Sequence, residues 1–329
     1  MNLPEKHKQN LIEAHEECAE IIRRYGGIPE PLETAILAED HRWFWKPRDV
    51  GFILVGESHV YTNKDEINVR IIPDRLPKEV PKSVPLNFVK LVYCFGYGEP
   101  YILDKPEKIE NNPGTRQYDD LFRMCAGFDE TPFDISGLQW KAKVLTTLKE
   151  RGFWLLDASC HACYLGRKKR LPNEIVKRIV PISWRKYVKP IIEETSTDKK
   201  RIWIIGKGLR NMLSAHDEFV KGLNWIYQPN AILKDPEKYQ EKRFRERQLK
   251  KATEQHRSEI HGTTKDITLE DTVAEVEHRN GYVISTEGRV ISGKQAQYAK
   301  YVEELKQKGI RGEEFRNPIY PKTVINPAF

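Results

Sequence analysis

Four short apolar runs, each followed by a polar or glycine-containing cluster, set the hydrophobic pattern of this chain. The first run spans residues 52–55 and ends at Gly56, and the others span 153–156, 201–205 and 224–227. Runs bounded in this way are typical of strands that are buried on both faces of a sheet. Segments with helical spacing of apolar residues separate them, which predicts βαβ crossovers and a mainly parallel sheet.

The predicted helices share a recurrence of apolar residues at helical spacing. They span 5–25, 32–39, 118–125, 138–151 and 173–192, the last of them divided near Pro181, and a charged helix is predicted over 238–251. The apolar run 89–95 fits a strand as well as a helix. The aromatic, basic segment 41–47 fits either a rim packed over the core or a platform on which bases stack.

Composition and charge narrow the class of protein. The chain has 329 residues and a net charge of +7, a moderate basic excess that is compatible with a polyanionic partner. No apolar run approaches the roughly 18 residues that span a bilayer, and the N-terminus lacks the apolar core of a signal peptide. Five cysteines, an odd number, fit a reducing compartment better than a disulfide framework. We therefore expect a cytoplasmic protein that does not associate with membranes.

Polar residues follow the predicted strands at the point where ligands bind in open α/β sheets. Glu57, Ser58 and His59 follow the first run, Asp157 follows the second, and Lys207 follows the third. Each cluster could equally be an ordinary turn between a strand and a helix, with solvated polar side chains.

The order and spacing of the four strand ends resemble the uracil-DNA glycosylase superfamily over about residues 48–231. These strand ends are Gly56-Glu-Ser-His, Asp157-Ala-Ser-Cys-His, Gly206-Lys-Gly208 and Tyr227-Gln-Pro-Asn230. The resemblance implies an α/β fold, a three-layer αβα sandwich with a central four-stranded, mainly parallel sheet in residues 46–235. Helical residues 1–45 and a basic extension, 236–329, would flank it. Within the extension, the pattern predicts a helix, a small hairpin at 282–292 and a helix at 295–308.

The resemblance also implies roles for individual residues. The loop from Gly56 to His59 corresponds to the family's water-activating loop, and Asp157 falls where the family reads the flipped base. Gln228, Pro229 and Asn230 replace the His-Pro-Ser loop that presses into the minor groove.

Several residues depart from the family pattern and favour a base other than uracil. Ser58 replaces an Asp that activates water, His59 replaces a Pro, and Val60 stands where some members carry a bulky Tyr. Gln228 lacks the imidazole that steadies the departing base anion.

Elementary chemistry assigns catalytic and base-binding groups. Glu57 is the candidate to orient or activate water, with support from Ser58 and His59. An ionised Asp157 only accepts hydrogen bonds, which suits a base with an exocyclic amine such as a 5-substituted cytosine. Val60 and Tyr61 would complete the base-binding group. The alternatives are a surface carboxylate for Glu57, a packing or solvated histidine for His59, and an Asp157 that caps the next turn.

The candidate DNA contacts are cations near the predicted crevice, together with the loop after the fourth run. They are Arg167, Lys168, Lys169, Arg170, Lys207, Gln228, Pro229 and Asn230. Clustered charge of one sign is what phosphate neutralisation requires, although a solvated helix face would show the same pattern. The helix over 238–251 would be either a further clamp on DNA or a solvated helix.

Two other motifs carry weaker signals. Cys160 and Cys163 have metal-like spacing, but buried thiols are the preferred interpretation, and we expect neither metal nor cofactor. Val60 breaks the Gly-x-Ser-x-Gly pattern of hydrolases that begins at Gly56.

The sequence thus predicts a hydrolytic DNA-base glycosylase that acts on a flipped, cytosine-like base. DNA repair or defence against modified foreign DNA would be its setting, and DNA its partner. The alternative is a non-catalytic DNA-binding protein on the same fold.

Overall fold

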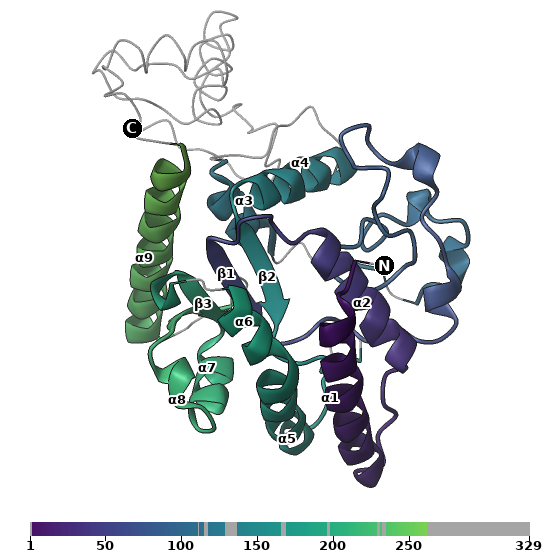
Figure 1. The fold of residues 1–329 in the computed structure, drawn as a ribbon, viewed down its shortest axis with the longest axis horizontal. Coiled ribbons are helices and arrows are strands. Elements are labelled where there is room, and N and C mark those ends of the chain that lie inside the picture. The colour runs from purple at the N-terminus through teal and green to yellow at the C-terminus, as the bar shows by residue number, and fades with distance from the viewer. Residues whose placement is uncertain are drawn as a thin grey trace, which may run out of the picture. The chain divides into compact units, whose positions relative to one another are not determined.

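The four apolar runs form one sheet of four parallel strands (Figure 1). The strands are β1 (Phe52–Gly56), β2 (Phe153–Asp157), β3 (Ile202–Ile205) and β4 (Asn224–Ile226), in the order β2-β1-β3-β4. The computed structural model describes residues 2–110, 112–114, 118–128, 137–165, 169–195, 198–228, 231 and 235–261. The prediction of an α/β fold around a parallel sheet is confirmed.

The register of the strands places all their carboxyl ends at one edge. Gly56 pairs with Asp157 across β1 and β2, and Val55 pairs with Ile204 across β1 and β3. Every residue of β1, β2 and β3 is buried, which explains why these runs are continuously apolar rather than alternating. The polar residues after each strand therefore lie along one edge of the sheet.

Helices connect the strands and cover the sheet. They are α1 (Glu5–Arg24), α2 (Leu32–Phe44), α3 (Asp119–Ala126), α4 (Gly137–Glu150), α5 (Asn173–Ser183), α6 (Lys189–Thr195), α7 (Lys207–Ser214), α8 (Glu218–Lys221) and α9 (Pro236–His261). Short 3₁₀ segments lie at Glu66–Asn68, Pro73–Arg75, Pro100–Ile102, Pro106–Lys108 and Lys199–Arg201.

Both faces of the sheet carry helices. Trp43 of α2 packs edge-on against Trp154 of β2, with ring centroids 5.2 Å apart. His256 of α9 packs against Phe153, the neighbour of Trp154, at 5.4 Å. Because successive side chains of a strand point to opposite faces, α2 and α9 cover different faces.

The run 89–95 forms neither the strand nor the helix that its pattern allowed. Its backbone makes successive turns, in which the N–H of Cys94 donates to the carbonyl of Leu91 at 2.9 Å. The turns bring the hydroxyl of Tyr93 to the edge strand β2, where it accepts from the N–H of Leu155 at 2.8 Å. An edge strand has unpaired backbone groups, and this segment satisfies one of them.

The helix predicted to divide near Pro181 instead continues beyond it. Pro181 lies inside α5, and a π-helical segment, Trp184–Val188, joins α5 to α6. A proline lacks the N–H that closes a helical turn, so a widened turn close to it is expected.

The aromatic segment 41–47 belongs to the core. Phe44 and Trp45 are buried, and the ring of the buried His41 bonds to the carbonyl of Asn87 at 2.8 Å. These rings are therefore a packed rim and not a platform for bases.

The compact unit is longer than the domain predicted over 46–235. It runs from Met1 to Ile260, and His261–Phe329 forms the other unit. Residues 1–45 belong to the first unit because α1 buries Leu11 and Ile22, and α9 belongs to it because Leu249 is buried. The hairpin at 282–292 and the helix at 295–308 lie outside the described residues. Over the part of the chain that the structure describes, no helix has the length and apolar character to cross a membrane.

A buried arginine holds the edge of β2 to α2. Arg42 donates to Glu39 Oε1 at 2.9 Å, to Asp157 Oδ2 at 2.7 Å and to the carbonyl of Leu155 at 3.1 Å. Tyr187 donates to the other oxygen of Glu39 at 2.8 Å. Burial alone would lower the pKa of Arg42, but the two carboxylates raise it. The guanidinium therefore stays charged in the core.

Replacing Arg42 with Met is expected to lower the free energy of unfolding by about 3–5 kcal/mol, because two buried carboxylates lose their partner. Urea denaturation measures the change. Arg24→Met is the matched control: it breaks the exposed Arg24–Glu20 pair of α1 and should cost no more than about 0.5 kcal/mol. Equal effects of the two substitutions would contradict this assignment.

Candidate functional site

A cavity of about 780 Å³ lies at the carboxyl ends of the strands. Glu57 after β1, Lys207 after β3 and Gln228 after β4 line it, and Tyr164 and Arg170 line it from the segment after β2. We call it the strand-end cavity. Of the polar residues expected at separate strand ends, Glu57, Lys207 and Gln228 meet at this cavity, whereas Asp157 is not among its lining residues.

Glu57 is held by Arg170. The guanidinium contacts both carboxylate oxygens, with Nη2 2.5 Å from Oε1 and Nε 3.1 Å from Oε2. Burial alone would lower the pKa of Arg170, but Glu57 raises it. The sequence predicts both residues to belong to the site. Because Arg170 binds Asn173 as well as Glu57, fewer of its guanidinium N–H groups are available to bind a phosphate.

Two tyrosines border the charged groups of the site. Burial and the nearby Glu57 raise the pKa of Tyr164 to about 12. Burial and the nearby Asp157 raise the pKa of Tyr118. A Cβ at Gly56 would lie 2.9 Å from Asp157 Oδ1 and 3.7 Å from the Tyr118 hydroxyl, so the close approach of β1 and β2 requires glycine there.

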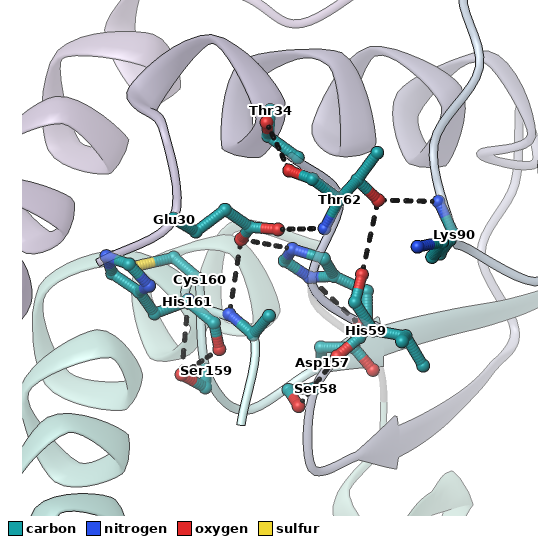
Figure 2. A network of polar contacts seen from close by, with 12 residues as sticks. Glu30, Thr34, Ser58, His59, Thr62, Lys90, Asp157, Ser159, Cys160 and His161 are labelled. Atoms are coloured by element: carbon teal, nitrogen blue, oxygen red, sulfur yellow. Dashed lines mark hydrogen bonds and ion pairs between the residues drawn. The ribbon is translucent and has the colours of Figure 1, made fainter. Parts of the chain in front are cut away.

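His59 does not face the strand-end cavity, contrary to the prediction of a supporting catalytic group. Its Nε2 donates to Glu30 Oε2 at 2.7 Å, and 1% of its side chain is exposed. Glu30 also accepts from the backbone N–H of Thr62 at 3.1 Å, as Figure 2 shows. It accepts from the backbone N–H of Ala162 at 3.2 Å as well. The buried carboxylate thus joins the loop after β1 to the loop after β2.

Asp157 lies between Arg42 and His59. Its Oδ2 accepts from Arg42 and lies 3.9 Å from His59 Nδ1, a buried nitrogen that has no hydrogen-bond partner among the described residues. Burial would lower the pKa of His59, but Glu30, aided by Asp157, raises it. Asp157, predicted to read the base, is buried and is not among the residues that line the strand-end cavity.

Ser58, in the loop after β1, and Cys160 and Cys163, in the loop after β2, are engaged in contacts within the protein. The hydroxyl of Ser58 donates to the carbonyl of His59 at 2.9 Å and accepts from the N–H of Cys163 at 2.9 Å. The thiol of Cys160 lies 3.2 Å from the hydroxyl of Ser183. Burial raises the pKa of Cys163 to about 12. Ser58 thus ties two loops together, and both thiols are buried as preferred. Among the described residues no group of three or more His, Cys, Asp or Glu side chains could hold a metal.

Val60 and Tyr61, predicted to bind the base beside Asp157, line a different cavity. Together with Lys169 they face a second cavity of about 380 Å³ that neither Glu57 nor Asp157 lines. The backbone N–H of Tyr61 donates to the carbonyl of Tyr164 at 2.8 Å. That bond directs Val60 and Tyr61 away from the strand-end cavity.

The predicted DNA contacts divide into three groups. Lys207 lies at the strand-end cavity, where its ammonium is 3.2 Å from Glu241 of α9 and 5.4 Å from the ring centroid of Trp225. Gln228 lies at the same cavity, whereas Lys169 is exposed at the second one. The remaining candidates lie outside the described residues: Arg167, Lys168, Pro229 and Asn230.

Three residues that shape the site were not singled out from the sequence. Glu30 lies between two prolines, a position typical of a surface turn, and Arg42 lies in the aromatic segment 41–47. Tyr164 follows directly after Cys163. The sequence marks Glu30 and Arg42 only as charged residues in an otherwise rigid or apolar segment. That signal is weak because the sequence does not show which residue each of them would pair with.

Comparisons with models of protein families, with curated proteins and with solved structures found no match to this chain. The chemistry of the site therefore rests on its own residues.

The His59–Glu30 pair should make part of the stability depend on pH. Because the folded pKa of His59 is raised above its ordinary value of 6.5, its contribution is fully present below that value and is lost as pH rises through the folded pKa. Urea denaturation between about pH 5 and pH 9 should show the stability advantage of wild type over His59→Gln shrinking with rising pH. An advantage that grows with pH would contradict the pairing, and Glu30→Gln should remove the dependence.

Proposed function

We propose that this protein is a DNA-base glycosylase that hydrolyses the N-glycosidic bond of a flipped, modified and cytosine-like base. The observation that carries the proposal is the convergence of Glu57, Lys207 and Gln228 on one cavity at the carboxyl edge of a parallel sheet. The volume of about 780 Å³ falls within the range of about 300–1,000 Å³ typical of ligand sites. Helices on both faces of the sheet support the three-layer αβα sandwich of the resembled family.

Glu57 is the group that would position the attacking water. A carboxylate has about four lone-pair sites, and Arg170 occupies two of them at the distances given above. The oxygens of Glu57 can still accept a hydrogen bond from a water molecule, and the guanidinium of Arg170 fixes the orientation of the carboxylate. Preorganised positioning of this kind lowers the barrier without a strongly basic group.

The departing base needs donors that stabilise its negative charge. The ammonium of Lys207 and the amide of Gln228 line the cavity, and both can donate. Lys177 lines the same cavity and adds a cation for DNA phosphates. The preference for a cytosine-like base over uracil is carried by the acceptor-only chemistry of Asp157, which pairs with Gly56 across the strands beside the cavity but does not line it. DNA repair or defence against modified foreign DNA, in the cytoplasm, is the setting that we propose.

The protein is incubated with duplexes that carry uracil, hypoxanthine or a modified cytosine, and we expect abasic sites in the duplexes that carry a modified cytosine. Alkali then cleaves the strand at each abasic site, and gel electrophoresis measures the fraction of cleaved strand. Glu57→Gln should slow the reaction by about 10²–10⁴-fold, because water loses its positioning group.

Glu20→Gln is the matched control, because it removes a carboxylate from the exposed Glu20–Arg24 pair. Its rate should equal that of wild type. Release of uracil alone would overturn the cytosine-like substrate, and an unchanged rate in Glu57→Gln would overturn the role of Glu57.

The second candidate function is DNA binding without catalysis. The bidentate hold of Arg170 on Glu57 favours it, because a carboxylate whose two oxygens both bind a guanidinium has fewer acceptor sites left for an attacking water. Binding to the intact duplex without abasic sites would select this candidate.

Both candidates require phosphate contacts at the rim of the strand-end cavity. Lys177→Gln and Lys207→Gln should each weaken DNA binding about equally for all sequences and reduce the slope of log affinity against log salt concentration by about 1. Fluorescence anisotropy at several salt concentrations measures both quantities. Lys221→Gln, on α8 and paired with Glu218, is the control that should leave the slope unchanged. Equal slopes in all four proteins would exclude this rim from the DNA interface.

A further inference from the structure

A short hairpin separates the strand-end cavity from the second cavity. An antiparallel bridge pairs Tyr164 with Arg170, and the N–H of Leu165 donates to the carbonyl of Lys169 at 2.7 Å. Tyr164 and Arg170 line the strand-end cavity, whereas Leu165, Lys169 and Leu171 line the second. Neighbouring residues of an extended segment point to opposite sides, so the hairpin is a wall with one cavity on each side.

The second cavity contains a buried ion pair. Lys90 Nζ lies 2.6 Å from Glu66 Oε1, and both residues are buried. Glu66 also accepts from the backbone N–H of Glu110 at 2.9 Å and of Asn63 at 3.0 Å. The carboxylate is therefore largely satisfied within the protein.

The ammonium of Lys90 is not satisfied to the same degree. It has three hydrogens to donate, and within the described residues Glu66 is its one hydrogen-bond partner. Lys90 lines the cavity, so its ammonium has hydrogens that it can donate to a molecule held there. An acceptor atom of a ligand in that space would receive such a hydrogen bond.

The remaining walls determine the character of the ligand. Tyr61, Tyr97, Val60 and Leu171 give the cavity aromatic and aliphatic surface. Apolar and aromatic walls beside polar groups suit a small organic molecule, and the volume of about 380 Å³ lies within the range of such sites.

The charges around the cavity balance. Lys90 faces Glu66 inside it, and the exposed Lys169 and Glu110 both lie at its rim. An uncharged ligand is therefore favoured over a phosphate, and the phosphate contacts remain with the strand-end cavity.

We propose that the second cavity binds a free nucleobase that carries a carbonyl group, with the ammonium of Lys90 donating to the carbonyl oxygen. The choice of a nucleobase among planar carbonyl compounds rests on the proposed function. The cavity itself, the buried ion pair and the capacity of the Lys90 ammonium to donate further hydrogen bonds do not depend on it.

Isothermal titration calorimetry of the full chain with hypoxanthine and adenine tests the proposal. The two purines have nearly the same shape, but only hypoxanthine has a carbonyl oxygen, so it should bind at least about tenfold more tightly. Equal affinities, or no binding of hypoxanthine, would overturn the role of Lys90.

Two space-filling substitutions locate the bound base. Val60→Phe narrows the second cavity without replacing either residue of the ion pair and should abolish binding of hypoxanthine. Met212→Phe narrows the strand-end cavity and should leave the affinity for hypoxanthine unchanged. The reverse result would place the base in the strand-end cavity and overturn the proposal.

Lys90→Met tests the donor directly and should remove the preference for hypoxanthine over adenine. Because it leaves Glu66 buried without its cation and could prevent folding, Val60→Phe decides the matter if Lys90→Met is unfolded. Binding of hypoxanthine by a protein that forms no abasic sites would refute base excision alone. Abasic sites without binding of any free base would refute this pocket alone.

Discussion

Two buried ion pairs at the carboxyl edge of the sheet, Glu30 with His59 and Arg42 with Asp157, are the interactions on which the site depends. They meet where His59 Nδ1 comes within 3.9 Å of Asp157 Oδ2. Charges out of water are tolerated only when they are paired and hydrogen-bonded. These pairs therefore allow one arrangement of the loops after β1 and β2, and that arrangement directs Glu57 into the strand-end cavity.

The need to pair buried charges also divides the residues after β1 into those that hold the loops together and one that faces the strand-end cavity. Ser58 and His59 are used within the protein, the first to hold Cys163 and the second to hold Glu30. Glu57 is the residue of the three that lines the strand-end cavity. The fork contact with Arg170 engages both oxygens of the Glu57 carboxylate and fixes its orientation. A role in positioning water is therefore more consistent with the geometry than a role in abstracting a proton.

The strands were predictable from the sequence, and the partners of their polar ends were not. A buried parallel strand leaves a local trace, an apolar run that ends at Gly56 or at Asp157. An ion pair leaves none: Glu30 and His59 lie 29 residues apart, and Arg42 and Asp157 lie 115 apart. The sequence therefore places His59 at the carboxyl end of β1, but it does not show that a carboxylate 29 residues away turns the side chain inward.

Tyr164 links the two cavities through different parts of one residue. Its phenol lines the strand-end cavity near Glu57, while its carbonyl accepts from the N–H of Tyr61, which lines the second cavity. A ligand that displaces the hairpin from either side must therefore strain a backbone bond that serves the other side. Coupling between two sites is reciprocal, so a base held beside Lys90 and a nucleotide held beside Glu57 would each alter the affinity for the other.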